Sequence, residues 1–305
     1  MKLIRGIHQL LDQHRPCVAS IGNFDGVHRG HQHIIKTLIC QSADFKLPAT
    51  VITFEPLSKE FFAPQSVQRL TSIEQRSQLL FELGVAQVLC IDFDADFASY
   101  SPQAFVKDVL FDGLGIKHLS VGDDFKFGKN RAGDFTLLQI LGQRYDFEVA
   151  AHDTFEIDTK RVSSGWVRQA LGESDFALVE HLLGRAYTIQ GQVTKGQQLG
   201  RTINFPTANI VLPTMFAPLS GVFAVRATWQ GQEIDGVANL GTRPTVDGSE
   251  NRLEVHLFDF DQNLYDETLS VQFISKIRDE QKFDSLDLLK VQIIKDAEAA
   301  RLALS

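Results

Sequence analysis

The stretch CVASIGNFDGVHRGH, residues 17–31, indicates most clearly how the first half of the chain folds. Residues 17–21 are small or apolar, a pattern typical of a fully buried strand. Apolar residues then recur at helical spacing, at Ile34, Ile35, Leu38 and Ile39. We therefore expect a strand, a glycine-containing turn and a helix in direct succession.

This succession of strand and helix repeats along the first half of the chain. Further buried strand patterns occupy residues 49–54, 88–91, 118–122 and 147–150, and helical patterns begin at Thr71, Ser101 and Asp134. Residues 71–74 have the spacing of a capping box with Thr71 as its first residue, and Gly84 is expected to end that helix. Strands that alternate with helices predict an α/β fold with a doubly wound parallel sheet.

The periodicity changes after about residue 185. Short alternating patterns, typical of half-buried strands, occupy residues 187–193, 222–227 and 252–257, and Asp247-Gly248 marks a turn. Helical spacing returns in residues 284–304. We expect this half to be an antiparallel β-barrel or sandwich followed by a C-terminal helix. The chain is thus predicted to have two domains, residues 1–184 and residues 185–305.

The composition is that of an ordinary globular protein. Of 305 residues, 44% are hydrophobic and 22% are charged, which excludes a disordered, collagen-like or coiled-coil chain. The formal charge of -8 means that the overall electrostatic field of the protein does not attract nucleic acid, so we expect no nucleic-acid partner. No uncharged apolar stretch reaches the ~18 residues of a membrane span, so we expect no membrane association.

The cysteines indicate a reducing compartment. There are three, without Cys-x-x-Cys spacing, so neither a disulfide framework nor a cysteine zinc site is expected. We therefore expect a cytoplasmic protein. The oligomeric state is left open.

A pair of histidines marks the first candidate site. His28 and His31 lie three residues apart at the start of the expected helix, so both side chains can share one face. The free N–H groups and the positive dipole end of a helix start favour phosphate. Two imidazoles can donate further hydrogen bonds to it. A zinc site is not expected, because no third ligand falls at a matching spacing.

Residues 22–31 resemble the His-x-Gly-His signature of the nucleotidyltransferase superfamily, and more closely the N-terminal module of bacterial bifunctional riboflavin kinase/FMN adenylyltransferases (FAD synthetases). Residues 53–56, 121–128 and 161–168 resemble further motifs of that module. The resemblance implies four catalytic residues, His28, His31, Ser164 and Arg168. It also implies ATP or phosphate contacts from Gly22, Asn23, Phe24, Asp25, Gly30 and Ser163, and flavin contacts from Phe54, Asp124, Phe125 and Phe127.

The chain departs from the pattern of this module at three positions. Leu57 stands where many members carry His, Lys126 replaces a usual Arg, and Gly165 replaces a usual Thr. The last change removes a hydroxyl near the phosphates, and the loss of one positioned donor can cost about 2–4 kcal/mol in a transition state. Gly165 therefore leaves open the alternative that the chain is an active kinase whose adenylyltransferase module is impaired. The phenylalanines assigned to the flavin are equally typical of core packing.

The second half contains a glycine-rich stretch that matches no common ATP-binding signature. Residues 191–196 have the spacing of a P-loop, but Gln197 stands where its Lys must be. Residues 113–115 fail as a Rossmann fingerprint, because His118 occupies the third glycine position. Phosphate binding in this half must therefore be argued from another motif.

Residues 200–210 (GRTINFPTANI), with residues 236–245 and 253–256, resemble the flavokinase module of the same family. The resemblance implies Thr207 and Asn209 as Mg²⁺ ligands and Glu254 as the base, although the pattern alone is equally typical of a turn and an exposed strand. Further ATP or phosphate contacts are implied for Gly191, Lys195, Gly196, Gly200, Arg201 and Asn239, and flavin contacts for Arg278, Glu280 and Phe283.

Together the two sets of motifs predict a bifunctional enzyme of flavin coenzyme synthesis. The barrel is expected to phosphorylate riboflavin with ATP, giving FMN. The N-terminal domain is expected to join FMN to the adenylyl part of ATP, giving FAD and pyrophosphate, with Mg²⁺ at both sites. The alternatives are a riboflavin kinase alone and a non-catalytic flavin-binding protein.

Overall fold

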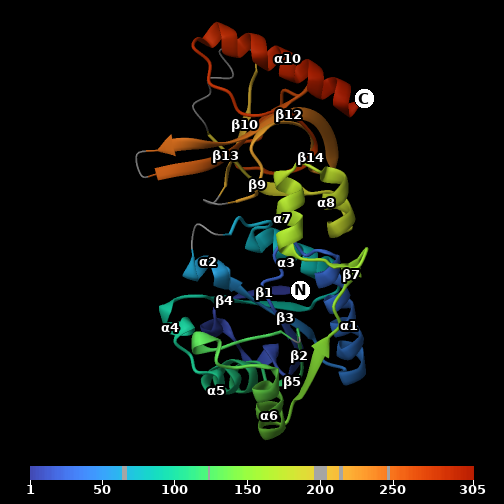
Figure 1. Cartoon of the computed structure of the whole chain (residues 1–305), viewed down its shortest axis with the longest axis vertical. Coiled ribbons are helices and arrows are strands. Elements are labelled where there is room, and N and C mark those ends of the chain that lie inside the picture. The colour runs from blue at the N-terminus through green and yellow to red at the C-terminus, as the bar shows by residue number, and fades with distance from the viewer. Residues whose placement is uncertain (64–66, 123, 196–204, 213–215, 246–247) are drawn as a thin grey trace. The chain divides into compact units, whose positions relative to one another are not determined.

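The computed structural model describes residues 1–63, 67–122, 124–195, 205–212, 216–245 and 248–305 (Figure 1). Contacts divide the chain into two units. The first consists of Met1–Val67 and Thr71–Ser164, and the second of Gln68–Leu70 and Gly165–Ser305. The domain boundary that we expect near residue 184 stays a prediction.

A six-stranded parallel sheet forms the centre of the first unit. Its strands are β1 (Lys2–Arg5), β2 (Cys17–Ile21), β3 (Ala49–Glu55), β4 (Gln87–Asp92), β5 (Ile116–Gly122) and β6 (Glu148–His152), in the order β1-β4-β3-β2-β5-β6. The predicted doubly wound α/β sheet is confirmed. One strand, β1, was not predicted, because four residues are too few to show a period.

Helices cover both faces of this sheet. They are α1 (Arg29–Phe45), α2 (Ser58–Phe62), α3 (Ile73–Glu82), α4 (Ala95–Ala98), α5 (Pro102–Ala104) with its π-helical continuation η3 (Phe105–Gly113), and α6 (Phe135–Tyr145); a small hairpin pairs β7 (Glu156–Ile157) with β8 (Lys160–Arg161). Val18 of β2 points into a core shared with α1 and α3, and its neighbour Ala19 points into a core shared with η3 and α6. This alternation follows from the period of two in a strand.

The order of the strands reverses beside β2. Its neighbours are β3, which leads to β4, and β5, which leads to β6. Ligands of parallel α/β sheets bind beyond the carboxyl ends of the strands at such a reversal. Because β2 and β5 end at Ile21 and Gly122, the segments that follow both strands begin at this edge.

Side chains that accept hydrogen bonds from backbone N–H groups begin several of the helices. Asp134 accepts one from Leu137 and begins α6, as predicted. Ser72 accepts one from Gln75 and begins α3, so the prediction of Thr71 as the cap is wrong. The Thr71 hydroxyl binds a carboxylate of a distant loop instead, a tertiary contact that local spacing does not show.

A buried histidine is expected to make the stability of the first unit depend on pH. His152 Nε2 lies 3.2 Å from Ser20 Oγ. Burial above all, and nearby His33 and His118, lower the pKa of His152 from 6.5 to about 4, whereas a backbone hydrogen bond at Ser120 and Asp153 act the other way. The folded pKa lies below the unfolded one, so the stabilisation is complete above pH 6.5 and is lost as the pH falls towards about 4.

The measurement is chemical unfolding followed by circular dichroism between about pH 7.5 and pH 5. We expect the free energy of unfolding to fall with pH, and the fall to be smaller in His152→Gln. His8→Gln, which changes an exposed histidine of the same unit, is the control. An equal pH dependence in His152→Gln and in the unaltered protein would contradict the prediction.

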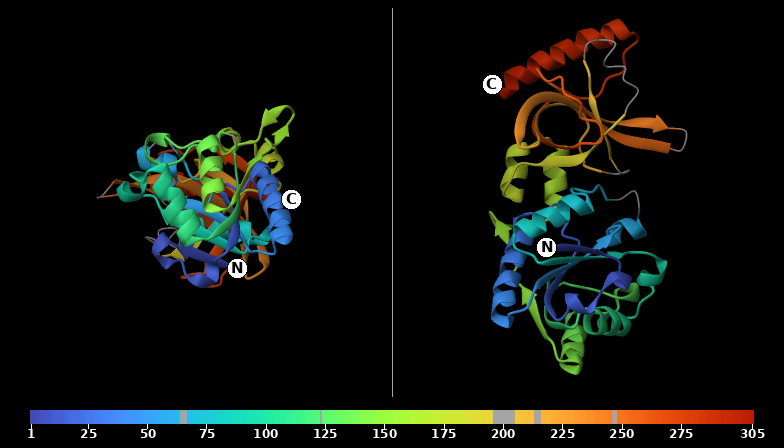
Figure 2. Two further views of the ribbon diagram at one scale, coloured as in Figure 1. Left: turned by 90° about the horizontal axis from the view of Figure 1, so that it is seen from below. Right: turned by 180° about the vertical axis from the view of Figure 1, so that it is seen from behind.

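The second unit contains a closed antiparallel β-barrel, and Figure 2 shows its strands as a ring beside the last helix. Its elements are α7 (Ser164–Gly172), α8 (Phe176–Leu183), β9 (Thr188–Thr194), β10 (Ala208–Leu212), β11 (Gly221–Trp229), β12 (Gln232–Thr245), β13 (Gly248–Leu257), β14 (Thr268–Arg278) and α10 (Leu286–Leu304). The order is β10-β13-β12-β11-β14-β9, and pairing of β9 with β10 closes the barrel. The predicted barrel and C-terminal helix are confirmed. Among the described residues, every helix is too short or too polar to span a lipid bilayer.

Candidate active sites

The loop between β2 and α1 brings His28 and His31 together. Their rings stack with 3.6 Å between centroids and 15° between planes. His28 begins α1, and its Nδ1 accepts a hydrogen bond from the His31 N–H at 3.2 Å. A neutral imidazole that accepts at Nδ1 carries its proton on Nε2. His28 therefore presents an N–H donor on its other side, at a helix start that favours anions.

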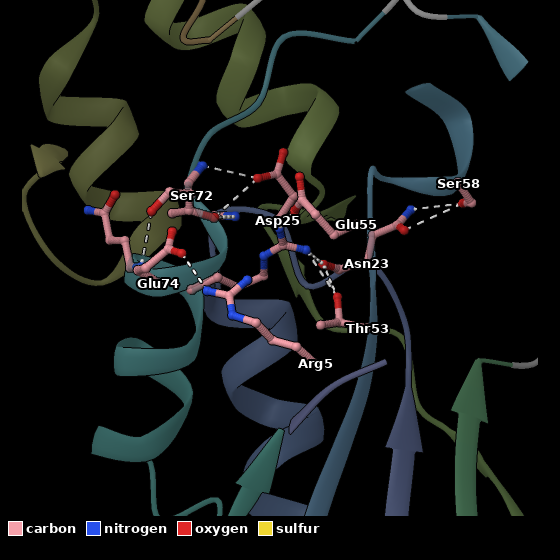
Figure 3. A network of polar contacts seen from close by, with 12 residues as sticks. Arg5, Asn23, Asp25, Thr53, Glu55, Ser58, Ser72 and Glu74 are labelled. Carbon is pink, nitrogen blue, oxygen red and sulfur yellow. Dashed lines mark hydrogen bonds and ion pairs between the residues drawn. The ribbon is translucent and has the colours of Figure 1, made fainter. Parts of the chain in front are cut away.

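Buried polar contacts hold residues 22–28 in place (Figure 3). Asp25 is 1% exposed, and its Oδ1 accepts hydrogen bonds from the Thr71 N–H and hydroxyl at 3.1 and 3.2 Å. The Gly26 N–H donates to the Thr71 hydroxyl at 3.1 Å. The Asp25 carboxylate thus anchors the loop to the segment before α3, and its contact with ATP stays a prediction.

Gly30 lets the start of α1 approach the segment that contains the two predicted serines. A Cβ at Gly30 would lie 3.1 Å from the His28 ring and 3.3 Å from the Val162 carbonyl oxygen. Ser164 begins α7, and its hydroxyl donates to the Asp25 carbonyl at 2.9 Å. The structure therefore places Ser164 against the loop that leads to His28 and Gly30.

The other residues assigned to the phosphates each make different contacts. Phe24 is 2% exposed, and its ring centroid lies 5.0 Å from that of His31. A Cβ at Gly22 would lie 3.2 Å from the Phe24 ring. Arg168 belongs to the second unit, where its Nε donates to the Gln68 carbonyl at 2.6 Å. The phosphate roles of these residues, and those of Asn23 and Ser163, stay predictions.

Aromatic rings surround the phenylalanines that we expect to contact flavin. Phe125 and Phe127 stack with centroids 5.5 Å apart and planes 13° apart. The Phe54 ring meets that of Phe93 edge-on, with centroids 5.5 Å apart. Phe127 is buried in the core, whereas Phe54 and Phe125 are half-buried at its edge. Core packing accounts for Phe127, while Phe54 and Phe125 keep surface that a planar ring could contact.

Local contacts account for two of the three departures from the family pattern. Leu57 is 2% exposed, so an apolar residue fits this position. Lys126 Nζ lies 3.5 Å from a carboxylate oxygen of Asp134, the residue that begins α6. Gly165 lies exposed in the first turn of α7. Asp124, assigned to flavin, lies on the surface with its carboxylate 3.3 Å from Arg161 Nη1, and its role stays a prediction.

In the second unit, the strand register aligns Asn209, Glu254 and Asn239 in one row. Asn209 on β10 and Asn239 on β12 both pair with Glu254 on β13. Directly paired residues project to the same side of a sheet, with Cβ atoms about 4.5–5.5 Å apart. The flanking Leu253 and Val255 are fully buried and project to the opposite side. The row thus joins residues assigned to the metal, the base and the phosphates.

Thr207 and Asn209 suit a Mg²⁺ ion that is also bound by phosphates. Asn209 is 5% exposed, and its Nδ2 donates to the Thr207 carbonyl at 3.2 Å, which turns the amide oxygen the other way. Within the described ranges there is no group of three His, Cys, Asp or Glu side chains that could hold a metal. Mg²⁺ commonly combines few protein oxygens with water and substrate phosphates, so the residues present fit this ion.

A pocket of about 490 Å³ adjoins Thr207. It is lined by residues 206–208, by Val255 and Leu257 of β13, and by residues 260–265. Its volume falls within the roughly 300–1,000 Å³ of small-molecule sites. Lys195 Nζ lies 5.8 Å from the ring centroid of Tyr265, which lines this pocket. The pocket therefore has the volume of a small-molecule site, and Val255, which lines it, projects to the side of β13 opposite to Glu254.

The glycine-rich stretch before β10 is described only at its start. At Gly191, a Cβ would lie 2.4 Å from a methyl carbon of Ile210, so glycine lets β9 approach β10. Its phosphate contact stays a prediction. Three residues assigned to phosphate, Gly196, Gly200 and Arg201, lie outside the described residues.

Arg278 at the end of β14 binds α10. Its Nε lies 2.9 and 3.0 Å from the two carboxylate oxygens of Asp296, and its Nη2 lies 2.7 Å from one of them. Its guanidinium also lies 5.7 Å from the ring centroid of Phe283. The Glu280 carboxylate packs against Gly241. These contacts join the segment after β14 to the barrel and α10, and the flavin contacts of Arg278, Glu280 and Phe283 stay predictions.

Two polar residues that support the loop at residues 22–28 were not predicted to do so. Thr71 was assigned to a helix start instead, and Arg76 was not singled out. Arg76 lies three residues after Ile73 and four before Leu80, on the buried face of α3. A charged residue on the apolar face of an amphipathic helix is the signal that would have identified it.

Two family models match the chain. Residues 10–166 match the family described as FAD synthetase. Residues 183–304 match the family described as riboflavin kinase. The first match covers strands β2 to β6 of the parallel sheet, and the second covers the barrel with its C-terminal helix.

Full-length relatives carry both parts in one chain. A bifunctional riboflavin kinase/FMN adenylyltransferase of Pseudomonas fluorescens is 47% identical over 302 residues, which are 99% of this chain and 97% of the relative. The protein of that name from Escherichia coli K12 is 47% identical over 304 residues, with the same coverage. A crystal structure from Streptococcus pneumoniae, of a protein described as a macrolide-efflux protein, is 31% identical, covers 99% of both chains and has a TM-score of 0.78. That description applies to the pneumococcal protein alone.

Proposed function

The chain belongs to the family of bifunctional riboflavin kinase/FMN adenylyltransferases, and on this premise we propose which residues perform each reaction. It is an enzyme that phosphorylates riboflavin to FMN with ATP and joins FMN to the adenylyl group of ATP, giving FAD and pyrophosphate. We assign adenylyl transfer to the loop at residues 22–31 and riboflavin phosphorylation to the row Asn209, Glu254 and Asn239. The two predicted domains, residues 1–184 and 185–305, carry these sites.

Two observations support the first assignment: His28 and His31 stack, and the Ser164 hydroxyl donates to the Asp25 carbonyl of the same loop. In this reaction an FMN phosphate oxygen attacks the α-phosphorus of ATP, the bond from that phosphorus to the β-phosphate oxygen breaks, and pyrophosphate leaves. The nucleophile is already an anion, so no base is required. The task of the protein is to stabilise the charge that develops on the phosphate oxygens. His28, His31, Ser164 and Arg168 supply the donors.

The cross-strand row supports the second assignment. The primary hydroxyl of riboflavin attacks the γ-phosphorus of ATP, the bond from that phosphorus to the β-phosphate oxygen breaks, and ADP leaves. The hydroxyl proton passes to Glu254, the carboxylate of the row. Asn239, directly beside it, orients a phosphate oxygen.

We further propose Mg²⁺ as the metal of both reactions. In the barrel, Thr207 and Asn209 would hold it. When bound, the ion neutralises part of the charge on the ATP phosphates. Because both reactions consume ATP, we propose the cytoplasm as the place where the enzyme works.

A time course that starts from riboflavin tests these proposals together. With riboflavin, ATP and Mg²⁺, the purified protein is expected to form FMN first and FAD after a lag, and EDTA is expected to stop both steps. Chromatography that resolves the three flavins measures this directly. If FMN forms but no FAD appears, even when FMN is supplied, the result would favour the alternative suggested by Gly165, an enzyme with kinase activity alone. Flavin binding without consumption of ATP would favour a non-catalytic flavin-binding protein.

A further inference from the structure

Arg76 on α3 is fully buried and contacts the loop that contains the first site. Its Nη1 donates to the Asn23 carbonyl at 2.8 Å and to Thr53 Oγ1 at 3.0 Å. Its Nη2 lies 3.5 Å from a carboxylate oxygen of Glu55. Figure 3 labels Asn23, Thr53 and Glu55, the three residues that Arg76 contacts. One guanidinium thus joins α3, the end of β3 and the loop.

These contacts determine the direction of one peptide group. The Asn23 carbonyl accepts a second hydrogen bond from the Thr53 hydroxyl, at 3.0 Å. The C=O and the N–H of a trans peptide point in opposite directions, so the Phe24 N–H points away from Arg76. This N–H has no hydrogen-bond partner within the part of the chain that the structure describes. A backbone N–H in a loop before a helix is a typical phosphate donor.

The same loop has strained backbone that needs support. Phe24 has a φ of 48° and Val27 a φ of 41°, and both side chains are buried. Positive φ is uncommon for residues other than glycine, and it is unfavourable for a β-branched residue such as Val. Strain of this kind persists only where surrounding contacts impose it, and it clusters at functional sites. Arg76 supplies two of the contacts that impose it, at Asn23 and Thr53.

We propose that Arg76 is a positioning residue for adenylyl transfer, which holds the Asn23–Phe24 peptide so that its N–H faces a phosphate of ATP. The inference rests on the proposed assignment of residues 22–31 to the ATP phosphates. It identifies a residue outside the four stretches that resemble family motifs in the first half. Because the guanidinium is fully buried, Arg76 acts through the loop and does not touch the substrate.

The test compares four variants of the full chain. Arg76→Met removes the guanidinium at similar length, Arg76→Lys keeps the charge, and Thr53→Val removes the second donor to the Asn23 carbonyl. Arg5→Met is the matched control, because Arg5 binds Glu74 of the same helix at 2.6 Å on the surface and does not contact the loop. Formation of FAD from supplied FMN is measured against ATP and against FMN, with riboflavin phosphorylation and thermal unfolding measured in parallel.

We expect Arg76→Met to lower kcat/KM for ATP by about tenfold or more, because it removes charged hydrogen bonds. KM for FMN and riboflavin phosphorylation should change little. Arg76→Lys should recover part of the loss, Thr53→Val should show a smaller loss of the same kind, and Arg5→Met should show none.

Two results would overturn the proposal. One is an Arg76→Met protein that makes FAD at the unaltered rate. The other is a loss that Arg76→Lys does not relieve, that Thr53→Val does not share and that follows the drop in thermal stability, since this describes a merely structural residue. His28→Asn, assayed alongside, distinguishes failure of the role of Arg76 from failure of the assignment of residues 22–31 to the ATP phosphates. If His28→Asn is fully active, the assignment of the loop has failed, whatever Arg76 does.

Discussion

His28→Asn should lower the rate of FAD formation from FMN and ATP by about 10²–10³-fold, as expected for the loss of one positioned donor to a developing charge. Asn is a good N-cap, so it can accept the His31 N–H as His28 Nδ1 does now. It lacks the Nε2 donor and the ring that stacks on His31. The rate of adenylyl transfer is measured by chromatography of FAD formed from supplied FMN.

The control for this variant is His33→Asn. His33 lies exposed on α1, and its ring packs against Phe155, with centroids 5.6 Å apart. We expect His33→Asn to make FAD at the unaltered rate, and both variants to phosphorylate riboflavin normally. If His28→Asn lost both activities while its thermal unfolding was unchanged, the assignment of one reaction to each predicted domain would be wrong.

Glu254→Gln should lower riboflavin phosphorylation by about 10²–10⁴-fold, the range over which general bases contribute. Gln has nearly the same size as Glu and can still contact Asn209 and Asn239 on the neighbouring strands. It cannot accept the proton of the riboflavin hydroxyl. FAD formation from supplied FMN should be unchanged, because none of the residues assigned to that reaction lies on a strand of the barrel. The two flavin products are quantified separately, with riboflavin or FMN as the starting material.

Glu233→Gln serves as the control for this variant. Glu233 is an exposed carboxylate on β12, the strand that also contains Asn239. Its replacement changes the formal charge of the barrel by the same amount as Glu254→Gln, and we expect no effect on either reaction. An unchanged kinase rate in Glu254→Gln would exclude Glu254 as the base.

Local signals predicted most of the fold. The strand at residues 17–21, the turn and the helix that follows it were predicted, because apolar runs, glycines and helical spacing all lie within a few residues of one another. Asp134 was identified as a helix start for the same reason. β1 was missed, because its partner is distant: Lys2 pairs with Gln87 of β4. The Thr71 cap was wrong, because a contact with Asp25 occupies that side chain.

The amino-acid order alone established that the two motif sets are present and that His28 and His31 share a helix start. It could not show that Asn209 and Asn239 flank Glu254, because strand register arises from the packing of distant segments. A shift of one residue would turn every side chain of β13 to its other face. Nor could it show that Arg76 holds the Asn23 carbonyl across 53 positions of the chain. That contact exists because folding buries one face of α3 against the loop, and a guanidinium enclosed there must find oxygen acceptors nearby.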